Sequence, residues 1–268
     1  MTKIMIDHDI EFFNEIDSTN NEAKRRIEVG TEPVRPLIIA ARSQTAGRGR
    51  QGKNFFSPKG TGIYLTAVCP MNCPIDGQVT VTSKTAVAVS RAIEGFFGIG
   101  CKIKWVNDIY VNDRKCCGIL CEAVNDYENN RLRYVIIGVG VNVYPSDWPD
   151  DIANIAGSVM SFNGKLSEEK FTGFAERISQ EILHVIYEAD GNEMDYYRER
   201  SYVIGREIVF YEHAGDQTQQ IAQTALAAGI DEKGGLIVEL PSGERRTLDS
   251  GEITVRRVEG NEKRRDHR

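Results

Sequence analysis

The chain contains 268 residues, with 39 Asp and Glu against 33 Lys and Arg, which gives a formal net charge of −6. A hydrophobic fraction of 41% is enough for an ordered core, and the length suits one large domain or a large domain with a small one. The acidic balance argues against a protein that coats nucleic acid, because such proteins neutralise many phosphates with basic side chains. Any anion-binding site must therefore be a local cluster of basic residues.

No segment has the pattern of a signal peptide or a membrane span. The first twenty residues carry several carboxylates and no long apolar block, and the longest apolar run, 134–143, is about half of what a membrane crossing needs. The six cysteines fit a reducing compartment, where thiols act as small apolar side chains, and their spacing does not favour a zinc site. We therefore expect a cytoplasmic protein without a membrane partner.

The first two thirds of the chain combine amphipathic helical patterns with short buried strands. Thr19 and Glu22 have the spacing of a capping box and predict a helix that ends near Gly30. Further helices are predicted over 78–97 and after Ser167, where apolar residues recur every three or four positions. Strands are predicted at 37–41, 63–68, 102–105, 109–111, 118–124 and 133–143, with turns at 112–113 and 129–130. This order predicts an α+β fold with a mixed, mostly antiparallel sheet backed by helices.

The composition changes at about residues 191–200. Beyond this point, short β-type runs separated by turns occupy 207–211, 219–228, 236–240, 245–248 and 253–258. We expect a large domain over 1–200, a small β-barrel over 201–260 and a charged tail over 261–268.

The segment GRGRQG at 47–52 follows a predicted strand and matches the dinucleotide-binding pattern G-x-G-x-x-G. The residues after it, 53–60, contain proline and glycine and cannot form the helix that holds a pyrophosphate in a Rossmann fold. Arg48, Arg50 and Lys53 instead form a glycine-hinged loop that can surround a compact anion. On spacing alone, a solvated basic loop and a phosphate site are equally good interpretations.

A second polar segment, KWVND at 104–108, places an ammonium, an amide and a carboxylate within five residues at a strand end. Lys115 begins the next strand after a short hairpin, and by itself such a lysine is usually only solvated. If both segments face the arginine loop, Lys115 can neutralise a carboxylate, while Asp108 can hold a metal ion or accept a hydrogen bond from an amine.

Several motifs occur together over about residues 10–145. They are Ser18-Thr19-Asn20, Gln44, GRGRQGK at 47–53, Phe56-Ser57-Pro58, KWVND at 104–108, Lys115 with Gly118-Ile119-Leu120, and Gly138-Val139-Gly140-Val141-Asn142. In this order they resemble the biotin protein ligases, and the segments at 229–231 and 251–253 resemble the last domain of that family. The resemblance implies a catalytic domain like those of class II aminoacyl-tRNA synthetases and biotin synthetases, followed by a small SH3-like β-barrel.

Two departures from the family pattern affect what we expect. Val106 stands where the family usually has proline, which leaves Asn107 and Asp108 intact but can change the turn that presents them. The Ser-Thr-Asn motif already lies at residue 18, so we expect a monofunctional enzyme without the DNA-binding domain that some members place before the catalytic domain.

The resemblance implies a two-step reaction that uses biotin and Mg²⁺-ATP. The carboxylate of biotin attacks the α-phosphate of ATP, which gives biotinyl-5′-AMP and pyrophosphate. A lysine of a biotin carboxyl carrier protein, in acetyl-CoA carboxylase or a related carboxylase, then attacks the mixed anhydride. The carrier domain is therefore the expected partner, nucleic acid is not expected, and a homodimer is left open.

The functional residues of the family carry over to the matching positions of this chain. The resemblance implies as catalytic residues Lys115, Arg48, Arg50 and Asp108, the last also as the candidate Mg²⁺ ligand. It implies as biotin-binding residues Ser18, Thr19, Asn20, Gln44, Arg48, Gly49, Arg50, Lys115, Gly118, Gly138 and Gly140. Of these, Ser18, Thr19, Asn20 and Gln44 would bond the ureido ring, and Lys115 would offset the charge of the biotin carboxylate. Gly138 and Gly140 would let the backbone approach the ligand. It implies as ATP- or adenylate-binding residues Arg48, Arg50, Lys53, Phe55, Lys104, Asn107 and Asn142, the last reading the adenine.

Two other functions stay open. A sister ligase for lipoate or another acyl acid would resemble this chain, but the polar triplet at 18–20 disfavours it, because an aliphatic dithiolane offers no ureido groups. An RNA-binding module would use GRGR as an arginine-rich patch, but the acidic composition and the lack of interleaved aromatic motifs oppose it.

Overall fold

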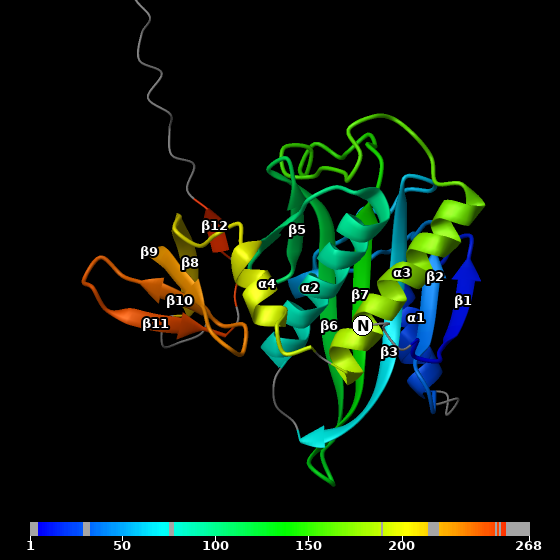
Figure 1. The fold of residues 1–268 in the computed structure, drawn as a ribbon, viewed down its shortest axis with the longest axis horizontal. Coiled ribbons are helices and arrows are strands. Elements are labelled where there is room, and N and C mark those ends of the chain that lie inside the picture. The colour runs from blue at the N-terminus through cyan, green and yellow to red at the C-terminus, as the bar shows by residue number, and fades with distance from the viewer. Residues whose placement is uncertain are drawn as a thin grey trace, which may run out of the picture.

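The computed structural model describes residues 5–28, 33–74, 78–188, 190–213, 220–249, 251 and 253–255. Within them, a large unit with a seven-stranded sheet is followed by a smaller unit with a five-stranded sheet (Figure 1). The order of strands in the large sheet is β1-β2-β3-β7-β6-β5-β4. In its described pairings β1 and β2 are parallel and the others are antiparallel, which confirms the expected α+β fold with a mixed sheet.

The elements of the large unit agree with most of the predicted ones. In chain order they are β1 (Asp9–Phe13), α1 (Thr19–Glu28), β2 (Leu37–Ala41), a 3-10 turn (Arg50–Gly52), β3 (Gly62–Pro74), α2 (Gln78–Phe97), β4 (Lys102–Lys104), β5 (Asp108–Val111), β6 (Arg114–Asp126), β7 (Arg131–Asn142), α3 (Glu168–Tyr187) and α4 (Glu193–Glu199). The prediction missed β1 and α4: β1 is an edge strand without a buried apolar run, and α4 has only 7 residues. None of the described helices is long and apolar enough to cross a membrane.

Successive residues of the central strands pack on opposite faces of the sheet. Ile39 and Ile136 lie on one face and pack with Ile27 of α1. Ile38 and Ile137 lie on the other face, in the core beneath α2 and α3 (Figure 1). The strands therefore read as continuous apolar runs, because both of their faces are covered. Because α1 has only 10 residues, it covers only part of its face of the sheet, and room remains there for a cavity.

The predicted helix starts differ in outcome. Ser167 caps α3 as expected, because its side chain accepts a hydrogen bond from the backbone N–H of Lys170 at 3.2 Å. The predicted capping box of Thr19 and Glu22 is wrong. Thr19 is already the first residue of α1, and its hydroxyl lies 3.1 Å from Gln44 Oε1, on the loop after β2. The predicted end of α1 near Gly30 lies outside the described residues.

The smaller unit is an open antiparallel sheet. It contains β8 (Glu207–His213), β9 (Gln220–Ile230), β10 (Leu236–Glu239), β11 (Arg245–Leu248) and β12 (Ile253–Val255), in the order β11-β10-β9-β8-β12. The expected SH3-like barrel is wrong for the described strands, because β11 and β12 form the two edges and do not pair with each other. These edge strands have only four and three residues. The charged tail at 261–268 lies outside the described residues.

Glu94 of α2 hydrogen-bonds the segment 196–200, which leads into the smaller unit. Its carboxylate accepts hydrogen bonds from Arg200 Nε at 3.0 Å, from the Tyr196 hydroxyl at 2.9 Å and from the backbone N–H of Cys101 at 3.2 Å. Burial raises the pKa of Glu94, but these hydrogen bonds, led by that of Arg200, outweigh it and lower the pKa overall. The ionised carboxylate of Glu94 thus ties the end of α4 to α2 where the smaller unit begins.

We expect Glu94→Gln to lower the melting temperature at pH 7 and to have little effect at about pH 3. A carboxyl group whose pKa is lowered by folding stabilises the chain above its ordinary pKa of 4.5, and this contribution is lost as the pH falls through the folded value. Thermal unfolding at the two pH values measures the difference. Glu199→Gln is the control, since Glu199 is exposed and lies 3.6 Å from Arg200. An equal effect of Glu94→Gln at both pH values would contradict the expectation.

Candidate active site

A cavity of about 390 Å³ lies on the α1 face of the large sheet. Nearly all of the predicted site residues line it: Thr19, Asn20, Gln44, Arg48, Gly49, Arg50, Lys53, Phe55, Lys104, Asn107, Asp108, Lys115, Gly118, Gly138, Gly140 and Asn142. Ser18 is the exception. It is buried outside the lining, and its carbonyl accepts the N–H of Glu22 at the start of α1. The structure therefore gathers segments that are up to about 120 residues apart into one place.

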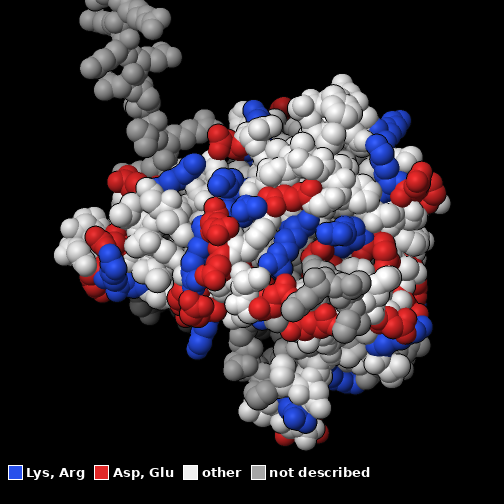
Figure 2. Space-filling model, in the orientation of Figure 1, with Lys and Arg blue, Asp and Glu red and all other residues white. Residues whose placement is uncertain are grey.

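The cavity is strongly basic although the chain is acidic. Its described lining contains five cationic side chains and a single carboxylate: Arg48, Arg50, Lys53, Lys104 and Lys115 against Asp108. On the face of the molecule in Figure 2, basic and acidic side chains are instead interspersed, without a large field of one sign. The expected local cluster of basic residues is thus present, and it can attract an anion that the net charge of −6 would repel.

Lys115 and Asp108 form an ion pair across the β5–β6 hairpin. Lys115 Nζ lies 2.7 Å from Asp108 Oδ1, and the two side chains are 28% and 18% exposed. The hairpin closes through Asn112 and Asp113, which both have positive φ, as the predicted turn requires. Among the described residues no group of three or more His, Cys, Asp or Glu could hold a metal ion. The ion pair with Asp108 holds Lys115 in place.

The arginine loop is linked to the KWVND segment. Arg50 Nη1 lies 3.2 Å from Asn107 Oδ1, and Asn107 Nδ2 donates to the carbonyl of Ile119 at 2.9 Å. The peptide between Trp105 and Val106 is cis. With Val106 in place of the usual proline, the turn still presents both Asn107 and Asp108 to the cavity.

The ring of Phe55 lies over a pair of glycines. Gly118 and Gly140 face each other on β6 and β7. A Cβ atom on Gly140 would lie 2.4 Å from the Phe55 ring, and one on Gly118 would lie 2.9 Å from it. The glycines were expected to let the backbone approach a ligand. In this structure they make room for Phe55 instead, so a ligand here would contact the aromatic ring.

Asn142 presents an unsatisfied acceptor. Its side chain is buried and lines the cavity, and Nδ2 donates to the carbonyl of Gly157 at 3.1 Å. Its Oδ1 has no hydrogen-bond partner among the described residues. Because an unpaired buried acceptor is costly, this atom is suited to a donor on a ligand, such as the amino group of adenine.

The segment 148–157 forms a cavity wall that the sequence analysis missed. Trp148, Ile152, Ile155 and Ala156 line the cavity, and the ring of Trp148 packs edge-on against Phe56 with centroids 6.1 Å apart. The segment contains turns rather than a helix or strand, so no periodic pattern marks it. Only its isolated aromatic and aliphatic residues could have indicated that the segment packs against a cavity.

Arg114 ties this wall to the β5–β6 hairpin. Arg114 Nη1 donates to the carbonyls of Ala153 and Ala156 at 2.8 and 3.3 Å. The backbone of Lys115 accepts from Gly157 N–H and donates to the carbonyl of Ile155. The wall is thereby attached directly beside Lys115.

The smaller unit completes the cavity. Tyr211, Gly251, Ile253 and Thr254 belong to the lining. Trp105 joins the two units, because its indole N–H donates to the carbonyl of Gly234 at 2.9 Å in the turn between β9 and β10. Residues so distant in sequence carry no local signal of a shared site.

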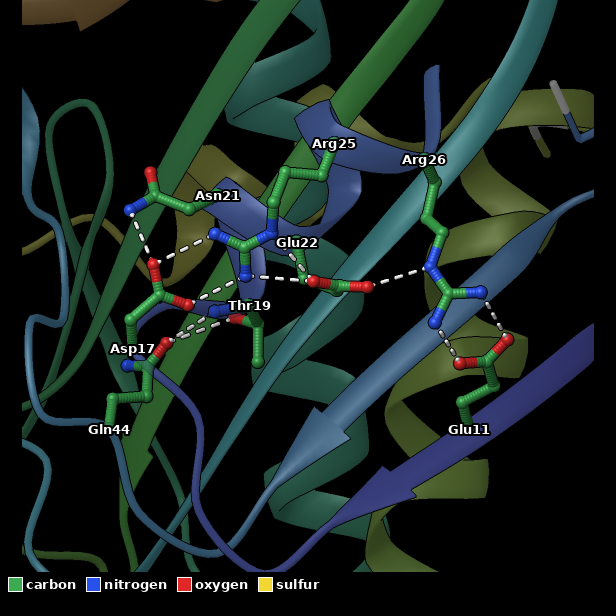
Figure 3. A network of polar contacts seen from close by, with 8 residues as sticks. All are labelled: Glu11, Asp17, Thr19, Asn21, Glu22, Arg25, Arg26 and Gln44. Carbon is green, nitrogen blue, oxygen red and sulfur yellow. Dashed lines mark hydrogen bonds and ion pairs between the residues drawn. The ribbon is translucent and has the colours of Figure 1, made fainter. Parts of the chain in front are cut away.

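A polar network fixes the start of α1, which carries Thr19 (Figure 3). Arg25 binds Asp17 at 2.8 Å and Glu22 at 2.7 Å, and Arg26 binds the other oxygen of Glu22 at 2.7 Å and Glu11 on β1 at 2.8 Å. The hydrogen bonds of Arg25 hold the pKa of Asp17 well below its usual range. This network sets the direction in which α1 presents its first turn.

Two family models match this chain. The model of the biotin/lipoate A/B protein ligase family matches residues 12–142, and the model of the biotin protein ligase C-terminal domain matches residues 213–256. The first match lies in the large unit and the second in the smaller unit, and the chain belongs to the biotin protein ligase family.

Curated relatives agree with this membership, and a solved structure shares the fold. The bifunctional ligase/repressor BirA of Bacillus subtilis is 35% identical over 166 residues, which are 61% of this chain and 50% of that protein, so the match spans half the length of the relative. The biotin--[acetyl-CoA-carboxylase] ligase of Paracoccus denitrificans is 24% identical over 88% of this chain and 96% of its own. The biotin protein ligase of Aquifex aeolicus, solved with biotin and ATP, shares the fold with a TM-score of 0.73 at 23% identity, over 93% of this chain and 99% of that one.

We expect Arg114→Gln to speed hydrogen exchange in the segment 152–157, because the carbonyls of Ala153 and Ala156 lose their cationic donor. Exchange followed by mass spectrometry should rise about tenfold in peptides of this segment, as the loss of about 1.5 kcal/mol would produce. Arg131→Gln, an exposed arginine at the far end of β7, is the control and should leave the segment unchanged. Unaltered exchange in Arg114→Gln would show that the wall is held by its backbone bonds alone.

Proposed function

We propose that the chain is an ATP-dependent ligase that activates biotin as biotinyl-5′-AMP and transfers it to a specific lysine of a biotin carboxyl carrier protein. The observation that carries the proposal is the composition of the cavity. A neutral hydrogen-bonding pocket at Thr19 and Gln44 is continuous with a cationic region and with the unpaired acceptor of Asn142. Such a cavity suits a neutral cyclic urea, an anionic reaction centre and an adenine.

The cationic side chains supply what the first step needs. Attack of a carboxylate on a polyphosphate brings two anions together, so negative charge must be offset as they approach. Lys115, held by Asp108 at 2.7 Å, suits the carboxylate of biotin. Arg48 and Arg50 suit the phosphates through bidentate contacts, and Lys53 and Lys104 extend the same basic surface.

Magnesium fits as a part of the nucleotide substrate. Asp108 is the only carboxylate in the described lining, and Mg²⁺ is commonly held by one or two carboxylates together with substrate phosphates. Asp108 would thus be a ligand of Mg²⁺-ATP, and the ion would help to neutralise the phosphates. Positioning of Lys115 is the role of Asp108 that its ion pair supports directly.

The second step requires that the adenylate be kept from water until a lysine arrives. Phe55 and Trp148 give the cavity aromatic walls, and Tyr211 and Ile253 of the smaller unit close another side. Exclusion of water protects the mixed anhydride and strengthens its contacts with the cations. The carrier lysine would enter at the rim, where Ile155 and Tyr211 are 54% and 47% exposed.

The sister activity on lipoate is the weaker candidate. The polar side chains of Thr19, Asn20 and Gln44 line the cavity, and a dithiolane ring would offer none of them a further hydrogen bond. The RNA-binding alternative is not favoured, because the basic residues lie inside a cavity instead of along an open surface. We further propose a cytoplasmic location, which the six free cysteines support, and we propose domain limits of 1–200 and 201–260.

The deciding experiment measures both half-reactions. ATP–pyrophosphate exchange should depend on biotin and not on lipoate, and labelled biotin should appear on a carrier domain and not on a carrier whose acceptor lysine is replaced by arginine. Size-exclusion chromatography with light scattering during the same assays would decide whether the chain works as a homodimer. Exchange that responds to lipoate alone would assign the chain to the sister activity.

We expect Lys115→Gln to slow biotin-dependent ATP–pyrophosphate exchange by at least about a hundredfold. Removal of a cation from the reacting anions costs about 2.7–4 kcal/mol, by analogy with lost oxyanion donors. Glutamine keeps an N–H for Asp108, so the melting temperature should change little. Lys165→Gln, an exposed lysine outside the cavity lining, is the control. Near-normal exchange in Lys115→Gln would remove Lys115 from the mechanism.

We expect Asn142→Ala to raise the KM for ATP about tenfold and to leave the affinity for biotin nearly unchanged. Its Oδ1 is the unpaired acceptor that the adenine amino group would satisfy, and one such hydrogen bond contributes about 1.5 kcal/mol. The same variant should lose much of its preference for ATP over GTP, because guanine carries an oxygen at that position. If the preference persists, another residue reads the base.

A further inference from the structure

Two cations and two aromatic rings form a stack that leads from the cavity to the smaller unit. Lys104 Nζ lies 5.7 Å from the centroid of the Tyr110 ring. This ring stacks on the ring of Tyr202, with centroids 4.8 Å apart and an angle of 27° between the planes. The guanidinium of Arg206 lies 4.1 Å from the centroid of the Tyr202 ring. Lys104 and Tyr110 belong to the described lining of the cavity, whereas Tyr202 and Arg206 do not. These four residues, the tyrosine stack, therefore connect a cation of the cavity to residues outside it.

The backbone holds the outer half of the tyrosine stack from both units. Tyr202 lies beside β4, because the N–H of Ile103 donates to the carbonyl of Arg200 at 2.8 Å and the N–H of Tyr202 donates to the carbonyl of Ile103 at 2.7 Å. The carbonyl of Arg206 accepts the N–H of Ala227 on β9 at 3.0 Å. The large sheet thus places Tyr202 and the smaller sheet places Arg206, so the stack spans the joint between the units.

Tyr110 contributes the face of its ring and not an acid–base group. Its side chain is only 7% exposed. Burial raises the pKa of its hydroxyl, and the nearby carboxylate of Asp108 raises it further. The phenol therefore stays protonated at neutral pH and cannot act as a base there. What remains for Tyr110 is contact, on the cavity side with Lys104 and on the other with Tyr202.

The surroundings of Lys104 explain why contact with a ring is useful. Four other cationic side chains of the described lining repel its ammonium, and the flexible stem of a lysine lets the charge turn away from them. The face of a tyrosine ring attracts an ammonium that lies within about 6 Å of its centroid. Tyr110 thus keeps Lys104 in the cavity before an anion is bound, and less freedom is lost when the anion arrives.

The order of strands indicates which part of a ligand Lys104 would meet. Lys104 lies on β4, the last strand at one edge of the large sheet. Gln44, in the candidate urea pocket, lies on the loop after β2, which is next to the other edge. A change in the tyrosine stack should therefore alter the binding of phosphates and leave the binding of biotin unaffected.

We propose that Tyr110 and Tyr202 are positioning residues that hold Lys104 toward the polyphosphate of ATP, so that the seating of the smaller unit sets the affinity for the nucleotide. The inference rests on the proposed function and specifies how one of its cations is held. Arg206 joins the stack to the smaller sheet. The large unit alone would contain Lys104 and Tyr110 but not the outer half of the stack.

The test measures ATP–pyrophosphate exchange by the full chain at saturating biotin. Tyr202→Leu removes a ring that lies outside the cavity lining. We expect its KM for ATP to rise about three- to tenfold, as the loss of an aromatic pair produces, and its kcat to change less than about twofold. The affinity for biotin, measured by calorimetry without ATP, should stay at the parent value. Tyr202→Phe keeps the ring and should keep the parent KM.

A double-mutant cycle separates positioning of Lys104 from a general structural effect. Lys104→Met removes the cation, so the stack then has nothing to position. In this background, Tyr202→Leu should change the KM for ATP by less than about 1.5-fold, whereas independent effects would multiply. Arg133→Gln is the matched control, because it removes an exposed cation 5.6 Å from the ring of Tyr134, near the start of β7. It should keep the parent KM.

The outcomes are distinguishable. An unchanged KM for ATP in folded Tyr202→Leu overturns the inference, and so does a rise that persists in the Lys104→Met background. A rise in Tyr202→Phe overturns it too, since the hydroxyl would then be the group that acts. If Tyr202→Leu does not fold, the exposed Arg206 decides: Arg206→Gln should raise the KM about twofold, and only while Lys104 is present. A parent chain whose exchange does not depend on biotin overturns the proposed function itself.

Discussion

The alternation of side chains along β7 is the constraint on which the rest of the structure depends. Every second residue, including Ile137, Val139 and Val141, lies in the core beneath α2 and α3. The residues between them that line the cavity are Gly138, Gly140 and Asn142. One strand therefore serves as core on one face and as the floor of the candidate active site on the other. A shift of its register by one residue would exchange the two faces and abolish both.

Protein side chains occupy the space above the glycines of this floor. The amide of Asn20 occupies the space above Gly138, and the ring of Phe55 occupies the space above Gly118 and Gly140. The floor therefore bears a layer of side chains brought in from α1 and from the loop after β2. Because this layer carries the polar and aromatic groups, the chemical character of the site can vary while the sheet beneath it stays the same.

The sequence predicts the elements whose signals are local. Helix α2 has the predicted bounds, and the cap of α3 at Ser167 follows from a serine before a helical stripe. The motif residues predict the cavity well, although they are spread over α1, the loop after β2, the β4–β5 hairpin and the strands β6 and β7. The capping box at Thr19 fails because a tertiary contact with Gln44 claims the hydroxyl, and spacing alone does not reveal such a contact. Thr66 donates to Asn20 Oδ1 at 2.8 Å, and Glu122 accepts from Asn20 Nδ2 at 3.1 Å. Both escape prediction for a related reason, since only the pairing of β3, β7 and β6 brings them to Asn20.

Because both units line the cavity, substitutions where the units meet affect the cavity as well. Ile253 and Thr254 belong to the cavity, yet their position depends on contacts such as the bond from Trp105 to Gly234 and the attachment of Arg200 to Glu94. A lesion at this joint changes the shape of the reaction chamber without touching a reacting group. In a genetic screen, substitutions at such residues would have the same phenotype as substitutions in the arginine loop. The functional unit that selection acts on is thus wider than the set of residues that contact substrate.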